Sequence, residues 1–161
     1  MHMIGVTLIT VGTLKENYLR DAAAEYEKRL GAFCKFAHVN LKEERLPDSP
    51  SEAEIKTALR REGERILAEI PKKAYKIALC VEGKQLSSEE LAKKLDEIGA
   101  THGELCLIIG SSHGLDDTVK SSCDMKLSVS KLTFPHQLMR VILLEAVYRG
   151  FNIIKGTHYH K

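Results

Sequence analysis

The sequence predicts an α/β protein with a mostly parallel sheet and flanking helices, arranged as a single domain over residues 1–161. Strand-like and helix-like segments alternate along the chain, which is typical of strand–helix–strand units. The length suits one domain, and 43% hydrophobic with 29% charged residues is the balance of a globular protein rather than a disordered one. No apolar run approaches the roughly 18 residues that a membrane span requires.

Four segments of the first half have the periodicity of regular structure. They are strands over 3–11 and 34–41 and helices over 15–30 and 52–70. The second strand alternates apolar and polar residues, so we expect it to be half exposed. Gly31 and Pro71 follow the two helices as stop signals, and two prolines mark a loop over 42–51.

The second half repeats the alternation with shorter connections. It contains strands over 75–81, 104–109 and around 125–129, and helices over 88–98, shortly after Gly114, and over 136–151. Gly83 is expected to turn the chain, and Ser87 with Glu90 forms a capping box. Pro135 starts the last helix, which is apolar nearly all round. Such a helix covers the sheet on one side, and a partner subunit is a candidate for the other.

Charge and cysteine content suggest partners and compartment. The net charge is only +2, but residues 120–161 carry seven basic residues against two acidic ones, so the rest of the chain is net negative. This distribution suits a localised anionic partner, although a solvated basic tail is the simpler interpretation. Cys34, Cys80 and Cys106 lie in apolar or alternating runs, which predicts buried thiols. Together with Cys123 they form no C-x-x-C pair, so we expect neither a disulfide framework nor a zinc site and a reducing cytoplasm as the setting.

Three loops that follow predicted strands are candidates for ligand binding, because open α/β sheets bind ligands beyond the carboxyl ends of their strands. They are residues 82–84, 110–114 and 130–135. No G-x-G-x-x-G motif, phosphate loop, nucleophile elbow or H-E-x-x-H helix is present. His158 and His160 have no neighbouring carboxylate or cysteine in sequence, so no metal is expected.

Long colinear blocks of the chain resemble the RlmH (YbeA-like) family of SPOUT methyltransferases, from residue 3 to residue 161. The blocks are VGTLKENY, EGKQLSSEELA, LIIGSSHGL, LSVSKLTFPHQLMRVILLEAVYR and the terminal YHK. The resemblance implies a sheet whose C-terminal part, within about 75–155, is tied in a trefoil knot. It also implies a homodimer that uses S-adenosyl-L-methionine to methylate N3 of a pseudouridine in 23S ribosomal RNA of the large subunit, in the assembled ribosome.

The resemblance also assigns cofactor-binding positions. They are Leu79, Gly110, Val129, Ser130, Lys131, Leu132, Thr133 and Phe134. Apolar members of this set suit an adenine ring, and the glycine allows close approach of the backbone. Ser111 stands where the family often has a second glycine, which raises the cost of any positive φ there.

The tail and one arginine are the expected catalytic and substrate-binding residues. They are Arg140, Tyr159, His160 and Lys161, which we expect to approach the RNA across a dimer interface. The lysine and arginine would contact phosphate or the anionic base, and His160 would relay the proton, although a flexible terminal histidine is the simpler interpretation. His136 has no assigned role at this point.

Methyl transfer from a sulfonium needs alignment rather than a metal. Because the net charge is small, we expect weak affinity for naked RNA. The alternatives are a SPOUT-type methyltransferase for another RNA, such as transfer RNA, and a non-catalytic ribosome-binding module.

Overall fold

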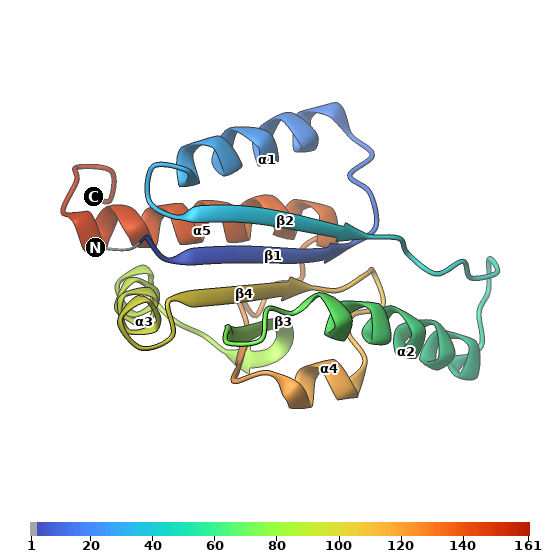
Figure 1. Cartoon of the computed structure of the whole chain (residues 1–161). Coiled ribbons are helices and arrows are strands. Elements are labelled where there is room, and N and C mark those ends of the chain that lie inside the picture. The colour runs from blue at the N-terminus through green and yellow to red at the C-terminus, as the bar shows by residue number, and fades with distance from the viewer. Residues whose placement is uncertain (1–2) are drawn as a thin grey trace.

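A five-stranded, all-parallel sheet forms the centre of the computed structural model, which describes residues 3–161 (Figure 1). The strands are β1 (Gly5–Val11), β2 (Lys35–Leu41), β3 (Tyr75–Lys84), β4 (Glu104–Ile109) and β5 (Met125–Leu127). Their order in the sheet is β2-β1-β4-β3-β5. The predicted α/β class is therefore confirmed, and the pairings are all parallel rather than mostly so.

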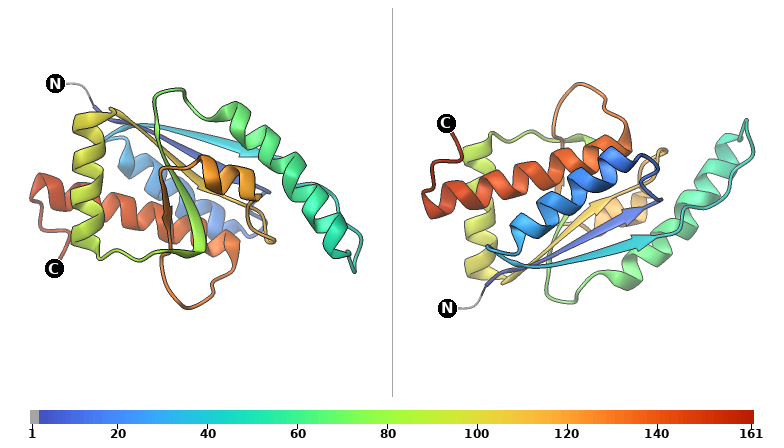
Figure 2. Two further views of the ribbon diagram at one scale, coloured as in Figure 1. Left: turned by 90° about the horizontal axis from the view of Figure 1, so that it is seen from below. Right: turned by 90° about the horizontal axis from the view of Figure 1, so that it is seen from above.

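Helices cover both faces of the sheet. They are α1 (Asn17–Leu30), α2 (Glu52–Glu69), α3 (Ser88–Thr101), α4 (Asp117–Ser122) and α5 (His136–Lys155). Helix α5 packs against α1 and α3 on one face, whereas α2 packs against α4 on the other (Figure 2). Two apolar clusters lie in these two interfaces, as expected for a three-layer α/β arrangement.

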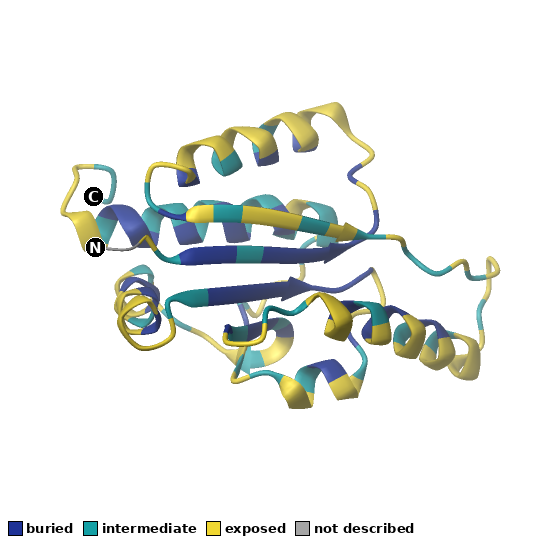
Figure 3. Ribbon diagram, in the orientation of Figure 1, coloured by how far each residue is buried: buried dark blue, intermediate teal, exposed yellow. Residues whose placement is uncertain are grey.

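Burial follows the position of each strand in the sheet. Strands β1 and β4 are buried over most of their length, while β2 at the sheet edge is largely exposed (Figure 3). This agrees with the apolar composition of 104–109 and the alternation over 34–41. Helix α2 and the loop before it extend beyond the β2 edge (Figure 2).

The prediction that Gly83 turns the chain is wrong. The structure continues β3 to Lys84, which pairs with Leu127 of β5 across an irregularity in the register. A Cβ at Gly83 would lie 2.6 Å from the backbone carbon of Leu127, so the glycine serves close approach of two backbones. Beyond this point the amide of Ser128 donates to the carbonyl of Lys84 at 3.0 Å.

Helix boundaries were predicted well where local signals set them. The capping box of Ser87 and Glu90 is present, and a second one, with Ser51 and Glu54, begins α2. Helix α5 runs four residues beyond its predicted end, to Lys155, where Gly156 takes a left-handed conformation with φ 77°. Cys34, Cys80 and Cys106 are buried as predicted, and all four cysteines are free. No helix in residues 3–161 is long and apolar enough to cross a membrane.

Candidate functional site

A cavity of about 490 Å³ opens at the carboxyl ends of β3 and β4. The chain leaves β3 for α3 on one face and leaves β4 for α4 on the other, so the two connections diverge there. Such a switch point is where open α/β sheets bind their ligands. Residues 79–82, 109–115 and much of 128–139 line the cavity, and its volume is typical of a small-molecule site.

The first wall of the cavity is the loop after β4. Gly110 packs so closely that a Cβ on it would overlap the carbonyl oxygen of Gly114. The amide of Gly114 in turn donates to the carbonyl of Ser111 at 2.9 Å, and Gly114 has φ 92°. The loop is therefore a tight turn that only glycine permits at both positions.

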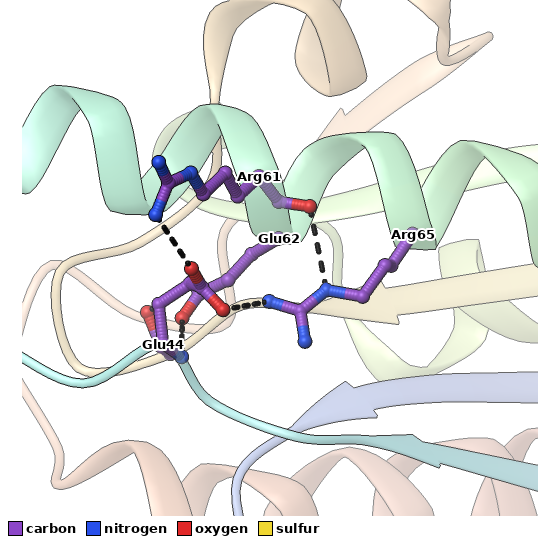
Figure 4. A network of polar contacts seen from close by, with 5 residues as sticks. Glu44, Arg61, Glu62 and Arg65 are labelled. Atoms are coloured by element: carbon purple, nitrogen blue, oxygen red, sulfur yellow. Dashed lines mark hydrogen bonds and ion pairs between the residues drawn. The ribbon is translucent and has the colours of Figure 1, made fainter.

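Ser111 joins this wall to helix α2. Its hydroxyl donates to Oε1 of Glu62 at 2.9 Å, while Oε2 of Glu62 accepts the backbone amide of Glu44 at 2.9 Å. Figure 4 shows that Glu62 and Glu44 lie together below α2, with the Arg65 guanidinium 2.7 Å from Glu44. Burial raises the pKa of the Glu62 carboxyl, and the two hydrogen bonds oppose that rise.

The second wall, residues 128–135, is held by short-range hydrogen bonds. The Ser128 hydroxyl donates to the carbonyl of Ser130 at 3.1 Å, and the amide of Leu132 donates to the Ser130 hydroxyl at 3.0 Å. Leu132 on this wall is 70% exposed, and Val81, which also lines the cavity, is 81% exposed. These exposed apolar groups suit a flat, partly apolar ligand.

Little net charge faces the cavity. Glu82 and Lys120 form an ion pair at 2.8 Å, and the lysine lowers the pKa of the Glu82 carboxyl through its hydrogen bond. His136 lines the cavity at the start of α5, and burial lowers its pKa, so the imidazole is neutral at neutral pH. Burial raises the pKa of the Cys80 thiol, also on the wall, to about 11. No group of three metal-ligating side chains occurs within residues 3–161.

Six of the eight predicted cofactor residues meet at this cavity. They are Leu79, Gly110, Val129, Leu132, Thr133 and Phe134. The other two, Ser130 and Lys131, belong to the second wall but do not line the cavity. Ser130 forms hydrogen bonds within its own loop instead.

The expected catalytic residues do not line the cavity of their own chain. Tyr159 donates from its hydroxyl to Glu145 at 2.6 Å, and His160 bonds Glu89 at 2.8 Å through Nε2, so the tail lies against α5 and α3. Burial and the bond to Glu145 raise the pKa of Tyr159.

Arg140 is only 4% exposed. Contact with RNA requires a surface residue, and within one chain Arg140 is not at the surface. Its Nη2 donates to the carbonyl of Gly12 at 3.0 Å, and its Nε is buried without a partner. The sequence pattern missed this burial because α5 is apolar nearly all round, so an arginine within it is interpreted as a solvent-facing residue.

Sequence reasoning also missed Glu62. It is 3% exposed and lies between Ala58 and Ile66, one helical turn from each, on the buried stripe of α2. A charged residue at a core position of an amphipathic helix is a signal that could have identified it.

The fold and the cavity define the class: a three-layer α/β protein with a largely apolar small-molecule site at a switch point of its parallel sheet. Residues 4–160 match a protein-family model described as a predicted SPOUT methyltransferase. The chain therefore belongs to the SPOUT methyltransferase family, whose fold implies a knotted C-terminal part.

Relatives with near-complete coverage agree with this membership. The chain is 52% identical over 158 residues to the ribosomal RNA large subunit methyltransferase H of Bifidobacterium adolescentis, covering 97% of this chain and 99% of that protein. It is 49% identical to the protein of the same name from Clostridium beijerinckii, covering 98% and 100%. A probable methylase family protein from Haemophilus influenzae has a similar fold, with a TM-score of 0.54 at 14% identity over 97% of this chain and 70% of that one.

Proposed function

We propose that this protein methylates large-subunit ribosomal RNA at N3 of a pseudouridine, with S-adenosyl-L-methionine as the methyl donor. The observation that carries the proposal is the cavity at the β3–β4 switch point, which brings together six of the positions that the family resemblance assigns to the donor. Relatives at about 50% identity over nearly the whole chain carry the name of a ribosomal RNA large subunit methyltransferase, which supports the choice of substrate.

The residues of the cavity fit this donor. Leu79, Leu132 and Phe134 offer apolar contact to an adenine ring, and the exposed side chain of Leu132 would be covered by it. Gly110 lets the first wall close tightly on itself, because a Cβ there would overlap Gly114. Because His136 is neutral and Glu82 is paired with Lys120, no unpaired positive charge on these groups opposes a cationic sulfonium.

The bound donor would supply an electrophilic methyl group. The protein has to align the acceptor nitrogen with that methyl group. It also has to accept the proton of the N3 imide, because the imide is protonated at neutral pH. We assign the proton relay to His160, with Tyr159 beside it, and contact with phosphate or the developing base anion to Lys161 and Arg140.

These residues are brought to the cavity by a second copy of the chain. Within one chain, Tyr159 and His160 lie against the second half of α5, whereas the cavity is lined by the beginning of that helix. A homodimer in which each tail serves its partner's cavity removes this separation. Arg140 is buried by contacts of its own chain, so its approach to RNA requires a rearrangement near Gly12.

The substrate is the assembled ribosome in the cytoplasm rather than free RNA. A net charge of +2 allows few phosphate contacts for one chain, and affinity for nucleic acid follows the number of phosphates neutralised. We therefore expect recognition of ribosome shape by a dimer surface.

The main experiment incubates the protein and S-adenosyl-L-methionine with ribosomes, and separately with transfer RNA, and maps the methylated base by mass spectrometry. The proposal expects one methylated pseudouridine in the large-subunit RNA and none in transfer RNA. Methylation of transfer RNA instead would identify the first alternative. Absence of donor binding in calorimetry would overturn the enzymatic function and leave the ribosome-binding module.

Deletion of residues 159–161 tests the tail. We expect lost methylation with unchanged donor affinity, because the assigned donor positions lie on the two walls of the cavity whereas the tail is assigned to the acceptor base and its proton. A Gly110→Val chain supplies the matched partner, since it keeps the tail but has a distorted first wall. Mixing the two inactive variants under subunit exchange should restore activity if tails serve partner cavities. No recovery on mixing would contradict the shared site.

A further inference from the structure

We propose that Glu62 is a positioning residue that fixes the first wall of the donor cavity through Ser111. The inference rests on the proposed function and adds to it a residue on α2, outside the cavity lining. The contact joins positions separated by 49 residues in sequence and is buried from solvent.

The cost of burying Glu62 indicates that its contacts matter. A carboxylate with 3% exposure loses its hydration and is kept only when hydrogen bonds replace it. Both oxygens have such a bond, one from the Ser111 hydroxyl and one from the Glu44 amide, each at 2.9 Å. Removal of either donor would leave a buried oxygen without a partner.

Ser111 transmits this contact to the cavity. It follows Gly110 directly, and its carbonyl accepts the amide of Gly114, which closes the turn of the first wall. The side chain of Ser111 therefore holds the turn from behind while its backbone forms it. Without the bond to Glu62, the turn is held only by its own closing hydrogen bond, from the Gly114 amide to the Ser111 carbonyl, and we expect that bond to open more often.

The helix that carries Glu62 is itself held against the same loop region. Gly63 packs against Asp116 and Val119 so closely that a Cβ would lie 3.2 Å from each. Glu44, which bonds Glu62, is held by Arg65 at 2.7 Å (Figure 4). The anchor point is therefore rigid on both sides of the carboxylate.

Glutamine separates positioning from charge at this site. The carboxamide of a Glu62→Gln variant has an oxygen for the Glu44 amide and an NH₂ group that donates to the Ser111 oxygen once the hydroxyl rotates. Glu62→Gln should therefore keep the loop in place, whereas Glu62→Ala should release it. Glu64→Ala, an exposed glutamate on the same helix, is the matched control.

The first measurement needs no ligand: amide hydrogen exchange at Gly114, whose N–H closes the turn. We expect exchange to rise about tenfold in Glu62→Ala and in Ser111→Ala, and to stay within about twofold in Glu62→Gln and Glu64→Ala. Unchanged exchange in both alanine variants would overturn the proposal. If Glu62→Ala does not fold, Ser111→Ala decides it, because that variant keeps the bond between Glu62 and Glu44.

The second measurement is donor affinity by calorimetry, with methylation at saturating donor. Each alanine variant should bind S-adenosyl-L-methionine about tenfold more weakly, and the double variant no more weakly than either single one. The turnover rate at saturating donor should stay near that of the wild type. Additive losses in the double variant, or equal losses in Glu62→Gln and Glu62→Ala, would overturn the proposal. Failure of the wild type to bind donor would refute the proposed function, while hydrogen exchange would still decide whether Glu62 fixes the loop.

Discussion

The two walls of the cavity differ in what holds them. The wall after β4 is tied through Ser111 to Glu62 on helix α2 and is closed by a turn that packs against Gly110. The second wall, residues 128–135, is held by hydrogen bonds within its own segment, such as the one from the Leu132 amide to the Ser130 hydroxyl, and it exposes Leu132 to solvent. The first wall is therefore formed before a ligand arrives, whereas the second gains much of its burial from the ligand.

The strongest test of the preformed wall is Gly110→Val. Its Cβ would overlap the Gly114 carbonyl, so the turn that forms this wall has to change shape. We expect a loss of donor affinity of about a hundredfold or more, measured by calorimetry. Gly99→Ala is the control, because a Cβ there makes only ordinary contacts with Ile4. Donor affinity within a few fold of the wild type in Gly110→Val would show that this wall is not rigid.

The second wall should respond to loss of apolar contact rather than to strain. Leu132→Ala removes a side chain that is 70% exposed without ligand, so the free energy of unfolding should hardly change. Covering that side chain with adenine is worth about 1 kcal/mol, which gives a roughly fivefold weaker donor affinity. Leu67→Ala, an exposed leucine on α2, is the control for calorimetry and thermal unfolding. A large loss of stability in Leu132→Ala would show that this wall is packed before binding.

His136, at the start of α5 where the second wall ends, should make donor binding depend on pH. Burial lowers the pKa of His136, so the folded protein binds its proton less readily than the unfolded chain does. The free energy of unfolding should therefore decrease as the pH is lowered through the histidine range. The affinity for a cationic donor should decrease in the same direction, severalfold between about pH 7 and about pH 5. Calorimetry on His136→Asn should show a weaker dependence, while the exposed control His158→Asn keeps it. An unchanged profile in His136→Asn would exclude this histidine as the source.

The smallest expected effect concerns stability at the first wall. Because burial raises the pKa of Glu62, the unfolded chain loses this proton at a lower pH than the folded protein does. Wild-type stability should therefore fall relative to Glu62→Gln as pH rises above about 4. Urea unfolding of both proteins at several pH values measures the difference. A difference that is constant with pH, or that shifts in favour of the wild type, would contradict the raised pKa.

The sequence predicted the elements of the fold because local signals determine them. Apolar composition identified β4 at its observed bounds, and the capping box of Ser87 placed the start of α3. The extension of β3 through Gly83 was not predictable, since it depends on the backbone of Leu127, 44 residues later. The local sequence around a glycine at the end of a predicted strand is the same whether the glycine turns the chain or allows a neighbouring strand to approach closely.

In the candidate site, too, features set by local sequence could be predicted, and features that depend on distant parts of the chain could not. The loops that line the cavity could be predicted because they follow strand ends, and the family resemblance assigned the individual positions. The burial of Arg140, the contact of the tail with α5 and the bond from Ser111 to Glu62 depend on elements far apart in sequence. No periodicity or spacing within one segment carries such information.

The close packing of Gly83 against β5 also bears on how the molecule assembles. The two cavity walls follow β4 and β5, and β3 lies between these strands and pairs with both. The pairing of β3 with β5 joins strands that are separated by an entire helix–strand–helix passage of the chain. Contacts of long sequence separation form late, because the intervening loop must first be closed. We therefore expect ligand binding by the cavity to return only after β3 and β5 have paired, so its recovery reports a later stage of refolding than helix content does.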